Sequence, residues 1–298
     1  MTPEEQYLSS CMRIIRNGTW TSAGHGGYRT KAVINVDMEY DCRVNHIPVL
    51  TTKKTAWRPA IAEMLGYLKG YTNAEQFRRL GTSTWDANAA TWQDSDFCAG
   101  PDDMGYCYGA VGSGFLLPDQ AKNLPGRGYY VNEYNDPIFN QWEPVIADLS
   151  AGQDNRREIV TFYHPGTMPM ACLPPCMHTH TFSLLGGYLH LTSYQRSADM
   201  PLGVPFNMIQ VAFLLQLVAQ ITGNKPGFAY HKIVNAHIYE NQIDLMQEQM
   251  QRIPKAEPLL FIDPLIETWD DVVNHMTLDH VELEHYESHP SIKYLFSV

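Results

Sequence analysis

Residues 171–180 (ACLPPCMHTH) bring together two cysteines and two histidines, side chains that commonly bind zinc or act as nucleophiles. A C-x3-C pair followed directly by H-x-H fits a tetrahedral zinc site poorly. If a strand begins near residue 178, His178 and His180 share one face of it, and Cys176 cannot easily join both. We therefore expect no metal site in this segment.

Cys176 has neighbours that favour a nucleophile. It follows Pro174 and Pro175, which stiffen the backbone before it. Arg196, reached through a short predicted hairpin, could lie against the thiol and lower its pKa, and the thiolate is the reactive form. From the spacing alone, however, a nucleophile is the less favoured interpretation, and the other is a small buried hydrophobic residue. We expect that structural role for Cys11, Cys42 and Cys172.

Periodicity predicts the elements that must position these residues. Helical spacing and end signals predict helices over residues 3–16, 61–68, 205–222 and 241–250. Alternating or β-branched runs predict strands over residues 32–40, 158–163, 181–185, 188–194 and 228–237. Gly186 and Gly187 accept the positive φ values of a tight turn, so two of these strands should form a hairpin.

The order of the elements predicts one α+β domain spanning residues 1–298, because the strands gather late, with helices before and between them. Helix 205–222 is apolar nearly all round, so it should be central and buried. Residues 97–155 are rich in Gly, Pro, Asn and Asp and should be mostly loop with short elements.

Composition limits the functional classes. At 298 residues and 44% hydrophobic, the chain can bury a substantial core. Its apolar runs are shorter than the roughly 18 residues of a membrane span, and its amino terminus lacks signal-peptide features. The net charge of −11 argues against a nucleic-acid surface, although a few arginines could still form a phosphate pocket. We expect a cytoplasmic protein without nucleic-acid or membrane partners.

Several segments together resemble the thymidylate synthase family. The run LPPC (173–176), then YQRSADMPLGVPFN (194–207), then HIYEN (237–241) matches its proline-cysteine, Q-R-S-x-D, L-G-x-P-F-N and H-x-Y patterns in order. The tail HPSIKYLFSV resembles the family's final HPxIK segment. The likeness covers the first helix and residues from about 47 to the end. It implies a mixed sheet with a long buried central helix, and a homodimer joined through that sheet.

The resemblance also implies the chemistry. Cys176 would add to C6 of a pyrimidine nucleotide, and the enolate at C5 would attack the one-carbon unit of 5,10-methylenetetrahydrofolate, a co-substrate. Glu63 matches the general acid/base, although a glutamate on an amphipathic helix usually faces solvent. Asn207 would bind the N3 and O4 edge of the ring, although it also suits a helix amino terminus. Tyr108 matches a tyrosine near C5.

Two further sets of residues follow from the resemblance. Those that would bind the nucleotide, dUMP, are Arg29, Arg156, Arg157, Gln195, Arg196, Ser197, Asp199, Asn207, His237 and Tyr239. Those that would bind the folate are Lys53, Trp85, Asp199, Gly203, Phe206 and Val298. In the family, the adjacent arginine pair reaches the phosphate from the partner subunit, although alone such a pair is typical of a solvated turn. The histidine and tyrosine of H-x-Y hold the sugar 3′-hydroxyl.

The chain departs from the family pattern at several positions. Met177 replaces the histidine after the nucleophile, Asn88 replaces a second tryptophan, and Asn235 replaces an aspartate. The loop after Arg29 is about four residues short in our alignment. Residues 88–150 form an insertion-rich region.

Bacteriophage deoxycytidylate hydroxymethylases share the first three losses but carry aspartate where Asn207 stands. An asparagine beside the folate would admit water to the exocyclic methylene carbon. We therefore expect a phage-type dUMP hydroxymethylase acting in the host cytoplasm. Thymidylate synthase, with hydride delivered by the folate, is the alternative. A third possibility, a catalytically silent binding protein, is disfavoured because the nucleophile and its companions are intact.

Overall fold

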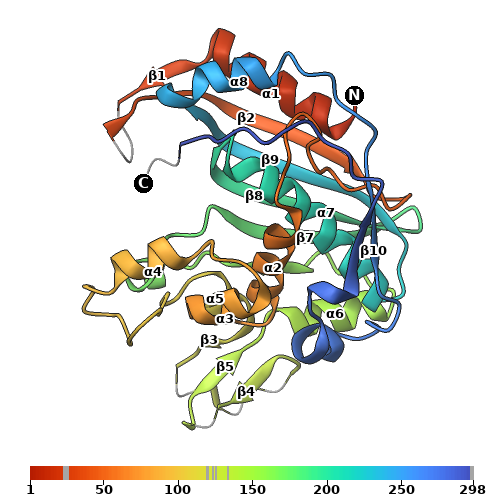
Figure 1. Ribbon diagram of the computed structural model, residues 1–298. Helices are drawn as coiled ribbons and strands as arrows, with labels where there is room; N and C mark the ends of the chain where they lie inside the picture. The colour runs from red at the N-terminus through yellow and green to blue at the C-terminus, as the bar shows by residue number, and fades with distance from the viewer. Residues whose placement is uncertain (23–26, 119–120, 123, 125, 133, 296–298) are drawn as a thin grey trace.

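The computed structural model describes residues 1–22, 27–118, 121–122, 124, 126–132 and 134–295. The main strands are β1 (Thr19–Thr21), β2 (Thr30–Asp41), β6 (Ile159–Thr161), β7 (Met177–Leu185), β8 (Tyr188–Asp199) and β9 (Pro226–Tyr239). In this part of the chain they form one six-stranded sheet in the order β1-β2-β9-β8-β7-β6 (Figure 1). Strands β8 and β9 pair in parallel and the other neighbours antiparallel. The predicted mixed sheet is confirmed.

The hairpin of β7 and β8 follows from its two glycines. Gly186 and Gly187 have φ values of 63° and 82°, which residues other than glycine rarely adopt. The turn fixes the register that places Met177 opposite Gln195. The segment carrying the cysteine therefore lies beside the Q-R-S segment, and the backbone N–H of Arg196 donates to the carbonyl of Cys176 at 2.9 Å.

The helices α1 (Pro3–Asn17), α2 (Trp57–Leu68), α7 (Gly203–Ile221) and α8 (Ile243–Gln249) cover the predicted helical segments. Thr2 and Glu5 form a capping box at the start of α1. The segment expected as one helix over 241–250 instead begins with the 3₁₀ turn η4 (Glu240–Gln242) and continues as α8. Helical spacing therefore predicted each of these helices, although the observed ends differ from the predicted ones.

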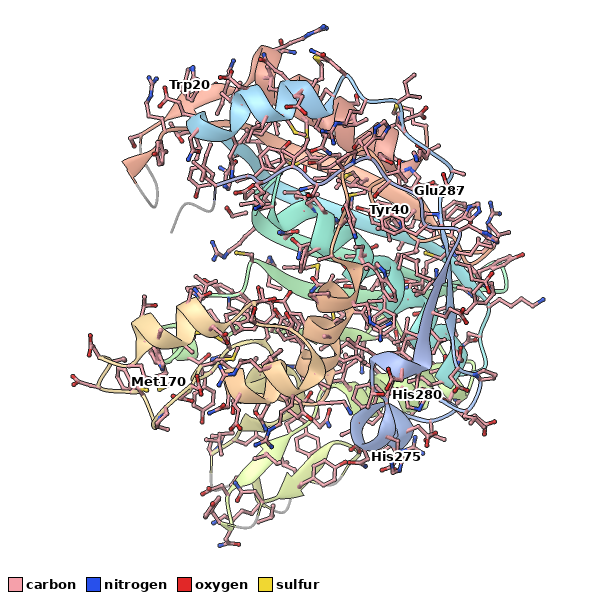
Figure 2. All side chains as sticks on the ribbon, in the orientation of Figure 1. Trp20, Tyr40, Met170, His275, His280 and Glu287 are labelled. Carbon is pink, nitrogen blue, oxygen red and sulfur yellow. The ribbon has the colours of Figure 1, made fainter. Side chains whose placement is uncertain are left out.

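Helix α7 joins the parallel strands β8 and β9 and forms the centre of the core. It is long and apolar enough to cross a membrane by length and composition, which corrects our expectation that no segment approaches that length. However, 83% of that apolar stretch is buried inside the fold, as in a core helix. Figure 2 shows side chains filling the space around it.

The region from 88 to 150 is mostly loop with short elements, as the composition of residues 97–155 predicted. It includes most of α4 (Asp86–Trp92), then α5 (Tyr108–Ser113), α6 (Trp142–Ser150) and a small sheet of β3 (Phe115–Leu116), β5 (Pro137–Phe139) and β4 (Tyr129–Val131). Trp142 is fully buried and anchors α6 in the core. These elements, with α3 (Ala74–Leu80), lie on one side of the main sheet in Figure 1. Short strands among turn residues give little periodicity, so the composition predicted short elements without placing them.

The remaining elements are η3 (Pro165–Met170), β10 (Leu259–Ile262), η5 (Asp271–His275), η6 (Leu278–His280) and β11 (Val281–Glu284). Strands β10 and β11 pair antiparallel, apart from the main sheet.

One face of the main sheet packs on α7, and the alternate positions point away from it. Along β8 and β9, buried residues such as Leu191 and Ile233 alternate with partly or fully exposed ones. Tyr194 and Val234 are 38% and 50% exposed on the outward face. An apolar, solvent-facing sheet surface is a feature of interfaces between subunits.

Candidate active site

A cavity of about 380 Å³ lies where α2, the loop before β7, the end of β8 and the start of α7 meet. Its lining residues are Glu63, Tyr67, Thr84, Trp85, Asn88, Tyr108, Leu173, Cys176, Met177, Gln195, Ser197, Ala198, Asp199, Leu202, Gly203, Phe206, Asn207 and Gln210. Its volume is within the range of small-molecule sites. The cavity therefore brings together residues from segments up to 147 positions apart in the chain.

Arg196 holds the cysteine loop in place. Its Nε donates to the carbonyl of Pro175 at 3.0 Å and its Nη2 to the carbonyl of Pro174 at 2.7 Å. Nη2 also lies 3.6 Å from the sulfur of Cys176. The contact predicted from the hairpin is thus present. Burial nevertheless raises the pKa of the Cys176 thiol, and the arginine only partly offsets that effect.

An aromatic wall stands beside the thiol. Tyr67 and Tyr108 stack with ring centres 4.2 Å apart, and Trp85 meets Tyr108 edge-on at 5.5 Å. The hydroxyl oxygen of Tyr108 accepts the backbone N–H of Cys176 at 2.9 Å. This wall gives the cavity an apolar, partly enclosed side on which a planar ring could stack.

Glu63 faces the cavity rather than solvent, because α2 is buried on that side. Its side chain is almost fully buried, and burial raises its pKa to about 7 despite hydrogen bonds that favour the charged form. Gln210 Nε2 donates to its Oε2 at 2.6 Å. A carboxyl group with a pKa near neutrality is suited to both donating and accepting a proton. Glu63 therefore lines the cavity with a pKa suited to proton transfer, and its role as general acid/base stays a prediction.

Asn207 lies in the first turns of α7 with its amide in the cavity. Its Oδ1 accepts from Gln195 Nε2 at 2.9 Å, and its Nδ2 donates to Gln210 Oε1 at 3.0 Å. One N–H and one oxygen lone pair remain for a ligand. The amide thus takes part in a side-chain network and does not act as a helix cap, since α7 has no side-chain cap at Leu202.

Four of the six predicted folate residues line the cavity. Trp85, Asp199, Gly203 and Phe206 line it, and Asp199 is fixed by Gln242 and by the backbone N–H of Leu202. Lys53 is buried behind them, where its ammonium donates to the carbonyl of Pro201, and burial lowers its pKa to about 8. Lys53 therefore supports the wall without lining it. Val298 lies outside the described residues.

His237 and Tyr239 lie on β9 beside the cavity. Asp199 pairs with His237 across the strands, and the two aromatic rings meet edge-on at 5.4 Å. Burial lowers the pKa of His237 to about 4, so its ring is neutral near pH 7.

The remaining predicted phosphate ligands lie away from the cavity in a single chain. Arg29 pairs with Glu240 on the surface, with Nε 3.2 Å from Oε2, and stacks on Trp20. Arg156 and Arg157 are exposed in the turn before β6 and are not among the lining residues. In a single chain Arg196 lies against the sulfur of Cys176, which lines the cavity, and none of these three arginines lines it.

Two of the departures from the family pattern, Asn88 and Met177, lie at the cavity. Asn88 lines it from α4, and Met177, almost completely buried, lines it next to the cysteine. Among the described residues, no group of three or more His, Cys, Asp or Glu side chains could hold a metal ion. His180 instead forms a hydrogen bond through Nδ1 to the hydroxyl oxygen of Ser193, at 2.8 Å.

The comparisons with known proteins identify the family. The thymidylate synthase family model matches residues 5–298. The chain belongs to the thymidylate synthase family. It is similar to proteins named thymidylate synthase from Psychromonas ingrahamii and Marinomonas sp., each 50% identical over 99% of this chain and 100% of the relative. A Shewanella loihica relative is 49% identical with the same coverage.

Membership in the thymidylate synthase family corrects part of the sequence-based interpretation. The phage-type hydroxymethylase specificity is unsupported, because relatives that are half identical along the whole chain carry the synthase name and come from bacteria. The hydroxymethylase prediction rested mainly on two residues, Asn88 and Met177, and not on the rest of the cavity wall. That wall also includes the aromatic group of Tyr67, Trp85 and Tyr108 beside the thiol.

Sequence reasoning missed several cavity residues that the fold supplies. Gln210 bridges Glu63 and Asn207, and Tyr67 stacks on Tyr108. A signal for the glutamine was present, because an amide inside a helix that is apolar all round must find hydrogen-bond partners. Tyr67 gave no such signal, since an aromatic residue on an apolar helix face is usually core.

Proposed function

We propose that the protein is a thymidylate synthase that converts dUMP to dTMP with 5,10-methylenetetrahydrofolate as co-substrate. The observation that carries the proposal is the arrangement of Cys176, Glu63 and Asn207 around one cavity, with Arg196 against the thiol. The name shared by the bacterial relatives reported above supports the same reaction. The folate supplies a one-carbon unit and then a hydride.

In the proposed mechanism Cys176 adds to C6 of the uracil ring. The thiol must first lose its proton, which burial opposes and Arg196 favours. Addition places negative charge on C5 and O4, and the free N–H of Asn207 stabilises that charge. The new bond makes C5 nucleophilic enough to attack the one-carbon unit.

Glu63 donates and accepts protons in the later steps. Its pKa of about 7 lets it give a proton to the departing folate nitrogen and accept one on the way to the exocyclic methylene group. Hydride transfer to the methylene carbon then gives the methyl group, while expulsion of the Cys176 sulfur from C6 restores the ring. The products are dTMP and dihydrofolate, so the folate is oxidised as the one-carbon unit is reduced.

We also propose that the active protein is a homodimer joined through the outward face of the main sheet. That face exposes apolar side chains, among them Tyr194 and Val234. Arg156 and Arg157 are exposed in their own chain, and in the dimer they would complete the partner's phosphate site. Guanidinium groups suit a phosphate because they donate two parallel hydrogen bonds.

The product decides between synthase and hydroxymethylase. We would incubate the protein with dUMP and 5,10-methylenetetrahydrofolate, follow the near-ultraviolet absorbance of dihydrofolate, and weigh the nucleotide by mass spectrometry. We expect one dihydrofolate for each nucleotide formed and a mass gain of one CH₂ unit. A gain of one CH₂O unit without dihydrofolate would overturn the proposal and support hydroxymethylation.

A further inference from the structure

The amide of Asn207 is held from both sides by the amides of two glutamines. Gln195, on β8, donates to its Oδ1, and Gln210, one turn further along α7, accepts from its Nδ2. Both glutamine side chains are almost completely buried. A buried side-chain network of this kind fixes the orientation of each of its members.

The orientation of Gln210 follows from acceptors on α2. Its Nε2 donates to the carbonyl of Ala60 at 3.1 Å and to the carboxylate of Glu63 at 2.6 Å. A backbone carbonyl can only accept, so the NH₂ group of Gln210 must face α2. Its oxygen must then face Asn207, and only the Nδ2 of Asn207 can donate to it. The carboxylate of Glu63 reinforces the same orientation.

The orientation of Gln195 is fixed independently from the sheet. Its Nε2 donates to the carbonyl of Ser197 at 3.1 Å as well as to Asn207. Its Oε1 lies 2.7 Å from Nε2 of the buried His231, whose Nδ1 lies 3.0 Å from the hydroxyl of Tyr40. Burial lowers the pKa of His231 to about 3, so the ring is neutral and donates through Nε2 in this network. Figure 2 labels Tyr40, at the far end of the chain of hydrogen bonds.

A primary amide alone discriminates poorly between uracil and cytosine. Uracil presents an acceptor, O4, beside a donor, N3–H, whereas cytosine presents a donor, the 4-amino group, beside an acceptor, N3. An amide can match either pattern by turning through 180° about its terminal bond. Discrimination therefore requires that this rotation be prevented.

We propose that Gln210, together with Gln195, determines base specificity by locking the Asn207 amide in the orientation that matches uracil. In that orientation the 4-amino group of cytosine would face the N–H of Asn207, a donor against a donor. Its N3 would face the amide oxygen of Asn207, an acceptor against an acceptor. Gln210 is a positioning residue, because it acts through Asn207. The inference rests on the proposed function, since it concerns how the same site selects its nucleotide.

The test compares Gln210→Met with Gln216→Met. Methionine has a similar volume and cannot donate or accept as an amide does. Gln216 is the matched control, because it is also a buried glutamine of α7 but donates to the carbonyl of His46, away from the cavity. The dissociation constants of dUMP and dCMP would be measured by calorimetry for the wild type and both variants.

We expect Gln210→Met to reduce the preference for dUMP over dCMP by about tenfold or more, the scale of one hydrogen bond. The ratio should stay unchanged in Gln216→Met. A folded Gln210→Met variant that weakens both nucleotides equally, or changes neither, would overturn the proposal. If that variant does not fold, Gln210→Ala is measured in the same way, and the same two outcomes decide.

The product assay of the wild type distinguishes this inference from the proposed function. A wild type that binds dUMP tightly but makes no dTMP would remove the proposed reaction and leave the specificity test intact. A wild type that makes dTMP, combined with an unchanged binding ratio in Gln210→Met, would remove the inference alone.

Discussion

The Nη2 atom of Arg196 lies 3.6 Å from the sulfur of Cys176. The same guanidinium donates to the two carbonyls immediately before the cysteine. The arginine therefore has two effects, since its charge favours the thiolate and its planar fork fixes the backbone that presents the sulfur.

Replacing Arg196 with lysine separates these two effects. Arg196→Lys keeps a positive charge but loses the forked contacts to the loop, so we expect kcat to fall at least about tenfold, the cost of one or two hydrogen bonds. The pH dependence of alkylation of Cys176 should move to higher pH. An exposed control, Arg43→Lys, should change neither quantity. Unchanged kcat and alkylation in Arg196→Lys would mean that the fork has no part in presenting the thiol.

Cys176→Ser tests the nucleophile itself. A hydroxyl at its ordinary pKa is a poor nucleophile toward C6, so turnover should fall by more than about a thousandfold. Binding of dUMP and the midpoint of urea unfolding should stay close to wild type, because the change is nearly isosteric. Cys172→Ser, in the same loop but outside the cavity lining, is the control. Substantial activity in Cys176→Ser would exclude covalent catalysis.

The main elements were predictable because their signals are local. The glycine pair predicted the β7–β8 hairpin, and an apolar run predicted α7, since each depends on neighbours in sequence. The small sheet of β3, β5 and β4 was not predicted, because strands of two or three residues are set by tertiary contacts rather than by periodicity. The β10–β11 pair was also missed, because strands of four residues still give little periodicity.

In the candidate site, too, some contacts were predictable from local signals and others were not. Cys176 and Arg196 could be brought together from the hairpin register alone, and the contact is present. The role of Gln210 could not be predicted, because it depends on how α7 lies against α2, which places Ala60 and Glu63 within reach of one amide. Helix packing of this kind has no signature in a single sequence.

Glu63→Gln should stabilise the fold at high pH. The pKa of Glu63 is about 7 in the fold against an ordinary value of 4.5, so the folded state holds this proton more tightly than the unfolded state. As the pH rises from 4.5 to 7, the buried group must lose its proton at a cost to the fold. Above pH 7 the variant should therefore be more stable than wild type by about 3 kcal/mol.

Urea unfolding at pH 5 and pH 8 measures this difference. The stability gain from Glu63→Gln should be small at pH 5 and largest at pH 8, while kcat falls at both values. Glu282→Gln, at an exposed position on β11, should show no such pH dependence. A gain that is equal at both pH values would show that Glu63 is not protonated at pH 5 in the fold.

Mixed dimers test whether Arg156 and Arg157 act across the subunit interface. Cys176→Ser and the double variant Arg156→Ala, Arg157→Ala should each be nearly inactive alone, because every site in either homodimer lacks one component. If the arginines serve the partner's site, a heterodimer of the two variants has one site with both defects and one intact site. Random exchange of subunits in equal amounts gives heterodimers in half of the molecules, so about one quarter of wild-type activity should return. Activity would be followed as dihydrofolate formation after mixing, with each variant alone as the control. If the arginines acted within their own chain, every site of the heterodimer would carry a defect, and mixing would restore nothing.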